Sequence, residues 1–319
     1  MHPDERVTII GAGVTGLTTA VVLAEAGHSV RVVADEIPGG TSLAAGAMWG
    51  PYLVEPKAMV DAWSQRSLEV FCDLASDAAT GVRVSSGIEA TRHYEAAPAW
   101  ARALPGFEPV GADKLPDGFR SGYRFSVPLI DMPTYLRYLL ERAGTAGVVV
   151  DDQHVSTLTS LTDADVIVNC SGMGAAVLAD DTDLRPIRGQ HVIVANPGLT
   201  EFFSEDTGMS SDLLCIYPQG EVIVLGGTAI DGSSDTTSDP VAADRILQRC
   251  IAVEPRLASA PVIEHRIGLR PTRSQVRVEA EQMTGTMVIH NYGHGGAGVT
   301  LSWGCAEQVQ QLLGSSASG

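Results

Sequence analysis

Apolar and polar positions near the start of the chain follow a simple order. Residues 7–10 form a short apolar run, residues 17–26 are rich in Ala, Leu and Val, and residues 29–34 form a second apolar run. Short apolar runs bounded by turn residues are typical of buried strands, whereas longer stretches of strong helix formers are typical of helices. The pattern therefore predicts a β-α-β unit whose first turn is the glycine-rich sequence at residues 11–16.

Helical patterns continue toward both ends of the chain, and strand patterns dominate its middle. Helices are predicted at residues 57–79, 132–143 and 241–253. Strands are predicted at residues 148–150, 165–169, 213–217, 221–225, 262–269, 275–280 and 286–291. Pro-Gln-Gly at residues 218–220 predicts a hairpin turn, and we expect the Gly- and Pro-containing segment 80–128 to be mainly loop.

This arrangement predicts an α/β protein with two domains. A Rossmann-like nucleotide-binding domain, made of discontinuous pieces, would carry an inserted β-rich substrate domain with an antiparallel sheet. The expected boundaries assign residues 1–55, 140–185 and 275–319 to the nucleotide-binding domain. Residues 56–139 and 186–274 would then form the substrate-binding domain.

Composition narrows the class of partner. The 319-residue chain is 45% hydrophobic and 18% charged, and its formal net charge is −17. So acidic a protein offers no basic stripe for nucleic acid or an anionic membrane. No apolar run approaches the roughly 20 residues that span a bilayer, and the charged start argues against a signal peptide. We therefore expect a cytoplasmic protein with small-molecule partners.

The cysteines occur singly, at positions 72, 170, 215, 250 and 305. This chain has no CxxC pair and no spacing of cysteines and histidines typical of a metal site, which argues against both a zinc site and a disulfide framework. The sequence therefore predicts no metal ion. We expect most of the cysteines to be buried as small apolar residues in a reducing compartment.

GAGVTG fits the G-x-G-x-x-G pattern between a predicted strand and a predicted helix. Its first glycine permits a tight turn, its second lets the backbone approach a pyrophosphate, and its third lets the helix pack closely. The helix N-terminus offers N–H groups to the phosphates, and an acid ending the second strand accepts a ribose hydroxyl and disfavours NADP. We expect FAD or NAD to be bound by Gly11, Ala12, Gly13, Val14, Thr15, Gly16 and Asp35.

A second small-residue segment lies near the expected diphosphate. The sequence TSLAAG at residues 41–46 offers hydroxyls and bare backbone, although a plain packing turn is the alternative. The candidate cofactor contacts in it are Thr41, Ser42, Ala45 and Gly46.

Two later motifs extend the interpretation to the whole chain. GLRPTR at residues 268–273 is followed by HNYGHGGAGVTLSWGCA at residues 290–306. With GAGVTGL, AAG and WGPY near residue 50, DVIVNCSG, RGQHVIV and VLGGT, they resemble the signature of the D-amino acid oxidase family, in the family's order. D-Aspartate oxidases share most of this pattern.

The resemblance implies an FAD-binding domain in which FAD extends from the GAGVTG helix to the HNYGHGG loop. It assigns Arg270 to the substrate carboxylate, in accord with the two parallel donors that a guanidinium presents. It assigns the carbonyl of Gly296 to the substrate amine and Thr300 to the flavin. His290 and His294 are expected to structure the loop. The other cofactor contacts it implies are Ser171, Gly295, Gly296, Gly298 and Val299.

The chain departs from the family pattern near the substrate. Cys215 stands where a tyrosine is usual, and Tyr217 follows on the same face of the predicted strand. We expect Tyr217 to substitute in part, with simple packing as the alternative. The predicted catalytic residues are Arg270, Tyr217 and Gly296, and Cys215 joins them as a predicted substrate contact. Ala229 replaces a basic residue of the D-aspartate oxidases, which favours neutral D-amino acids.

The reaction that the resemblance implies is oxidative deamination of a D-amino acid. A hydride passes from the substrate α-carbon to flavin N5, the imino acid hydrolyses to a 2-oxo acid and ammonia, and dioxygen yields hydrogen peroxide. Alternatives on the same fold are a glycine or sarcosine oxidase and a D-aspartate oxidase. An NAD-dependent dehydrogenase and a dinucleotide-binding sensor are further alternatives, and a homodimer is left open.

Overall fold

The computed structural model describes residues 6–50, 54–205, 212–283 and 285–316. Its first element is the predicted β-α-β unit: β1 (Arg6–Ile10), α1 (Val14–Glu25) and β2 (Ser29–Ala34), with β1 and β2 paired in parallel. The helix begins at Val14, three residues earlier than predicted, so the last residues of the glycine motif belong to α1. Pro51 and Tyr52 of the WGPY landmark lie outside the described residues.

Within these ranges the strands form one fourteen-stranded sheet with two differently built halves. The parallel half has the order β14–β7–β1–β2–β6, with β14 at Thr286–His294, β7 at Val166–Asn169 and β6 at Val149–Asp152. The other half has the order β4–β5–β3–β9–β10–β11–β8–β13 and is antiparallel except between β3 and β9. Its strands are β3 (Val82–Thr91), β4 (Glu108–Val110), β5 (Ser121–Ile130), β8 (Arg185–Ala195), β9 (Phe202–Glu205), β10 (Asp212–Gln219), β11 (Val222–Thr228) and β13 (Val262–Met283), and β12 (Ile230–Asp231) pairs with β8.

A single strand joins the two halves. β13 pairs with β8 along its first part and with β14 along its second part, and the register shifts between Thr272 and Arg277. The prediction of two separate strands at 262–269 and 275–280 is therefore wrong, because the polar residues between them continue the ladder instead of turning. The strand also crosses the predicted domain boundary between residues 274 and 275.

The segment at residues 80–128 is not mainly loop, as we had expected. It contains β3 and β5, which pair over their full lengths, together with β4 and the short helix α4 (Ala99–Arg102). Gly87 interrupts the apolar pattern of β3 because Phe202 of the neighbouring strand occupies the space that a side chain would need. The signal for the strand is therefore tertiary packing, which the local sequence does not display.

The hairpin turn lies further along than predicted. β10 continues through Pro218 and Gln219, and the chain turns at Gly220, with φ +75°, and Glu221. Proline is tolerated in β10 because β9 pairs only with Cys215 and Ile216, so no neighbouring strand needs the missing N–H on that side.

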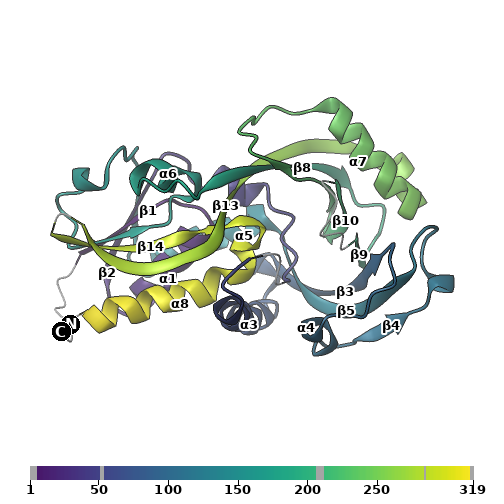
Figure 1. Ribbon diagram of the computed structural model, residues 1–319, viewed down its shortest axis with the longest axis horizontal. Helices are drawn as coiled ribbons and strands as arrows, with labels where there is room; N and C mark the ends of the chain where they lie inside the picture. Colours follow the sequence, from purple (N-terminus) through teal and green to yellow (C-terminus); the bar gives the residue numbers. More distant parts are fainter. Residues whose placement is uncertain (1–5, 51–53, 206–211, 284, 317–319) are drawn as a thin grey trace.

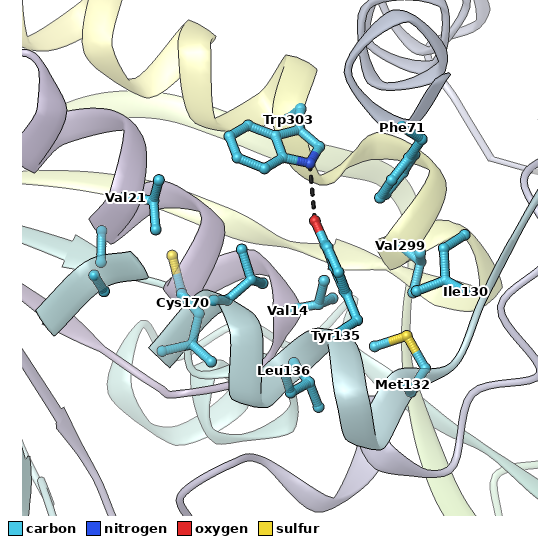
Figure 2. Packing of buried hydrophobic residues seen from close by; sticks show 14 of the residues in the cluster. Val14, Val21, Phe71, Ile130, Met132, Tyr135, Leu136, Cys170, Val299 and Trp303 are labelled. Atoms are coloured by element: carbon cyan, nitrogen blue, oxygen red, sulfur yellow. Dashed lines mark hydrogen bonds between the residues drawn. The ribbon is translucent and has the colours of Figure 1, made fainter. Parts of the chain in front are cut away.

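Helices cover both halves of the sheet. The parallel half is packed by α1, α5 (Met132–Thr145) and α8 (Gly298–Ser316), and Figure 1 shows α8 lying along α1. α3 (Lys57–Leu74) packs against α8 and against β3 and β5. In the core between α5 and α8, Trp303 Nε1 donates to the Tyr135 hydroxyl over 2.9 Å, as Figure 2 shows. Over the antiparallel half, α7 (Pro240–Val253) buries Ile246 and Cys250 against β8 and β11.

The remaining short elements border the sheet. They are α2 (Gly40–Leu43), α6 (Ala175–Leu178) and the 3-10 turns η1 (Ala78–Thr80), η2 (Ala112–Lys114), η3 (Leu158–Ser160), η4 (Gly172–Gly174), η5 (Pro255–Ser259) and η6 (Gly295–Ala297). None of the helices in the described ranges combines the length and apolar character needed to cross a bilayer.

Candidate active site

A cavity of about 830 Å³ extends from the glycine turn of the parallel half to the antiparallel half. Every residue that the sequence singled out for cofactor or substrate lines it, with the exception of Gly16. Gly16 lies inside α1, where a side chain would collide with the carbonyl oxygen of Gly11. The cavity therefore unites the two glycine-rich motifs that lie at opposite ends of the chain.

The glycine turn at one side of the cavity is shaped by close backbone contacts. Gly11 has φ +105°, and a Cβ there would lie 2.5 Å from the carbonyl oxygen of Cys170. Gly13 caps α1 without a side chain, while the N–H of Val14 donates to Ser42 Oγ over 2.9 Å. The turn is thus held open at the start of a helix, which is where phosphate groups bind.

Side chains around this end hold the cavity walls in place. Asp35 lies 3.0 Å from His154 Nδ1, and both side chains are exposed. Ser171 Oγ donates to Asn169 Oδ1 over 2.6 Å, and Thr41 Oγ1 donates to the Leu269 carbonyl over 3.3 Å. The Thr41 contact joins α2 to β13, the strand that carries Arg270, whereas the other two contacts lie within the parallel half.

The C-terminal glycine loop forms the opposite wall. β14 ends at His294, a 3-10 turn covers Gly295–Ala297, and α8 begins at Gly298. Thr300 Oγ1 donates to the Gly50 carbonyl over 3.1 Å, which ties the start of α8 to the segment after α2. His290 Nε2 lies 2.7 Å from Glu281 Oε1, across the β13–β14 pair.

Arg270 enters the cavity from β13, and its position depends on a glycine of the neighbouring strand. Its Nη1 donates to the Thr228 carbonyl over 3.1 Å. A Cβ on Gly189 of β8 would lie 2.5 Å from the same nitrogen and 2.7 Å from the guanidinium carbon. The guanidinium therefore lies directly over the backbone of Gly189, and a side chain at that position would displace it.

Three further side chains share this end of the cavity. His191 Nδ1 lies 2.8 Å from the Ala44 carbonyl, and burial together with nearby Arg270 lowers the pKa of His191 to about 4. Burial raises the pKa of the Cys215 thiol to about 12 and the pKa of Tyr217 well above its ordinary value. At neutral pH these three side chains are uncharged, so none of them competes with Arg270 for a substrate anion.

Sequence reasoning missed several residues of this wall. Gly189 and His191 belong to the RGQHVIV landmark, which carried no assigned role. Glu89, Trp100 and Ser204 also line the cavity; the first two come from the segment expected to be loop. Among the described residues, no group of His, Cys, Asp and Glu side chains could hold a metal ion.

The geometry suits an extended dinucleotide. The cavity begins at a helix start whose N-cap residue, Gly13, has no side chain, passes two glycines that leave room for close approach, and ends at the half-buried Arg270. The fold and this site define a protein of the dinucleotide-binding class with a small-molecule chamber beside the cofactor cleft.

Comparison with known proteins identifies the family. A family described as FAD dependent oxidoreductase matches residues 6–312. The D-amino-acid oxidase of Rubrobacter xylanophilus is 48% identical over 98% of this chain and 97% of its own length, and that of Streptomyces coelicolor is 42% identical over 97% of each. The chain belongs to the FAD-dependent oxidoreductases, and its cofactor is FAD.

Solved structures confirm the predicted fold class. Glycine oxidase from Geobacillus kaustophilus superposes with a TM-score of 0.82, covering 98% of this chain and 95% of that chain, at 20% sequence identity. At this identity the likeness concerns the fold.

Proposed function

We propose that this protein is a D-amino acid oxidase that acts on neutral D-amino acids. The observation that carries the proposal is the guanidinium of Arg270, which the Thr228 carbonyl and the bare backbone of Gly189 position in the same cavity as the glycine turn. Whole-chain similarity to relatives named D-amino-acid oxidase supports it.

In this proposal Arg270 binds the substrate carboxylate through two parallel N–H donors. The carbonyl of Gly296 accepts a hydrogen bond from the substrate amine, and Tyr217 and Cys215 border the substrate. Bound in this way, the substrate is oriented by four groups of the protein, and such positioning supplies a large part of the rate enhancement in enzymes of this type.

The cofactor contacts that we propose comprise the glycine turn, the segment 41–46 and the C-terminal glycine loop. By residue they are Gly11, Ala12, Gly13, Val14, Thr15, Gly16, Asp35, Thr41, Ser42, Ala45, Gly46, Ser171, Gly295, Gly296, Gly298, Val299 and Thr300, of which Gly16 acts through packing. FAD, when bound, supplies the two-electron oxidation of the substrate α-carbon.

No side-chain base is required in this proposal. Burial lowers the pKa of His294 to about 4, and burial with Arg270 lowers that of His191 to the same range. A base whose conjugate acid is so strong takes a proton poorly at neutral pH. The chain's own contribution is therefore binding, orientation and exclusion of water.

The preference for neutral side chains rests on the residue that follows the GGT turn. Ala229 offers no cation to an acidic side chain, whereas a second arginine would be expected in an oxidase of D-aspartate. The products proposed are a 2-oxo acid, ammonia and, with dioxygen as oxidant, hydrogen peroxide. The proposal further includes a cytoplasmic location, a homodimeric assembly as an open question, and the division into FAD-binding (1–55, 140–185, 275–319) and substrate-binding (56–139, 186–274) domains.

The test is anaerobic mixing of the purified flavoprotein with D-alanine or D-valine. We expect the flavin absorbance to bleach and, after admission of air, hydrogen peroxide to form. Turnover of glycine or sarcosine with no response to any D-amino acid would instead identify the glycine-oxidase alternative. A protein that photoreduces normally but responds to neither class would support the dinucleotide-binding sensor.

A further inference from the structure

A row of paired residues, most of them with polar side chains, runs across the antiparallel half of the sheet on the face of the cavity. Residues that are direct partners in neighbouring strands point to the same face. The partners, from β5 through β3, β9, β10 and β11 to β8, are Tyr123, Glu89, Ser204, Cys215, Gly226 and His191. Glu89, Ser204, Cys215 and His191 of this row all line the cavity.

Glu89 is the acidic member of the row, and it is buried with 6% of its surface exposed. The Tyr123 hydroxyl donates to its Oε1 in a short hydrogen bond, and Ser204 Oγ donates to its Oε2 over 3.4 Å. Each carboxylate oxygen thus has a hydroxyl partner, an arrangement that satisfies an ionised carboxylate in a buried position.

Glu89 lies on the side of the chamber away from Arg270. Two strand spacings separate it from Cys215, which corresponds to about 10 Å along the sheet. Its charge also reaches Tyr217, whose pKa it raises further. A substrate whose carboxylate binds Arg270 therefore has room to extend its side chain along the row toward Glu89.

We propose that Glu89 is a specificity-determining residue of this site. Its carboxylate forms an anionic far wall, which rejects D-amino acids with an anionic side chain and favours those ending in a hydrogen-bond donor or a cation. The inference rests on the proposed oxidase function and goes beyond it, because the absence of a cation at Ala229 explains weak binding of an acidic side chain but no active rejection.

The test compares isosteric substrates that differ in charge. In the wild-type holoenzyme we expect kcat/KM for D-glutamine to exceed that for D-glutamate. In Glu89→Gln we expect this ratio to fall by about tenfold or more, because the substitution removes the repulsion between two like charges. The ratio of D-lysine to D-norleucine should fall in the same variant. Glu201→Gln removes an exposed acid paired with Arg124, and should leave both ratios unchanged.

A second variant covers the case in which Glu89→Gln loses its fold or its flavin. The double substitution Glu89→Met with Tyr123→Phe removes the charge and its buried donor together, a replacement that costs less than leaving one partner unsatisfied. We expect the same fall in both ratios. Unchanged ratios in either flavin-loaded variant would overturn the inference, whereas a wild-type protein that oxidises no D-amino acid would overturn the proposed function instead.

Discussion

The two ends of the cavity are built in different ways. At the cofactor end one contiguous stretch, residues 11–16, supplies the turn, the helix start and the close packing. At the substrate end the wall is assembled from strands far apart in the chain, with Arg270 on β13, Gly189 on β8, Cys215 on β10 and Glu89 on β3.

This difference separates what local sequence can specify from what strand register specifies. A contiguous motif keeps its geometry because successive residues are covalently linked. An assembled wall keeps its geometry only while the strands stay in register, since a slip of one residue turns every side chain to the other face. Substitutions at the two ends should therefore impair different properties of the protein.

The largest effect is expected at the substrate end. Arg270→Ala should lower kcat/KM for D-alanine by about 1,000-fold, mainly through KM, because a charged two-donor contact with the carboxylate is lost. Steady-state peroxide assays check this, and the flavin content should stay at the wild-type level. Arg270→Lys keeps the positive charge but loses the two parallel N–H donors, so its kcat/KM should lie between those of the wild type and Arg270→Ala. An unchanged KM in Arg270→Ala would refute the carboxylate role.

At the cofactor end we expect loss of stability and flavin together. Gly11→Ala places a Cβ 2.5 Å from the Cys170 carbonyl at φ +105°, and should destabilise the fold by about 2–3 kcal/mol. Urea unfolding and the ratio of flavin to protein measure the two effects. Gly27→Ala is the matched control, because Gly27 also has positive φ, +93°, but nothing within 4 Å of its Cβ position; an equal flavin loss there would assign the effect to backbone conformation alone.

A smaller effect should follow from Gly189→Ala. The new Cβ would displace the guanidinium of Arg270 without touching the glycine turn, so kcat/KM should fall by about tenfold through loss of orientation. Flavin content should not change. If activity is retained in full, Arg270 does not need the position that it has over β8.

The smallest effect is a pH dependence of stability. The pKa of His191 is lowered to about 4 in the fold, from an ordinary value of about 6.5. The unfolded chain therefore binds more protons between these values, and stability present above pH 6.5 is lost as the pH falls toward 4. Between pH 7 and 5.5 His191 should contribute a loss of about 1 kcal/mol.

Urea unfolding of the wild type and of His191→Gln at both pH values isolates this contribution. The variant should show a smaller loss of unfolding free energy on acidification. An identical loss in both proteins would mean that folding does not lower the pKa of His191.

Much of the parallel half could be predicted from sequence. Continuous apolar runs predict β1, α1, β2 and β7. Strands covered on both faces need apolar residues at every position, so their sequences are easy to identify. The cofactor turn was predictable for the same local reason: its glycines, helix and acid follow one another within about 25 residues.

The substrate end could be predicted only where the family resemblance assigned a role to its residue. Arg270 was found through GLRPTR, whereas Gly189 was missed although it makes room for the arginine. Glu89 gave no local signal, because β3 carries Gly, Ser and Arg in place of a clean alternation and its partners lie more than 30 residues away. Such contacts depend on the register between strands, which no single segment of the sequence determines.

The continuous course of β13 has a consequence for how substrate range can diverge. One strand, β13, carries Arg270, the proposed carboxylate-binding residue, and further along pairs with β14, which leads into the C-terminal glycine loop. In the proposed reaction, this single strand therefore fixes the distance between the bound carboxylate of the substrate and the C-terminal glycine loop. Residues on β3, β9 and β10 do not belong to β13 or β14. Substitutions there can therefore change which substrate side chains are accepted without moving the reacting carbon.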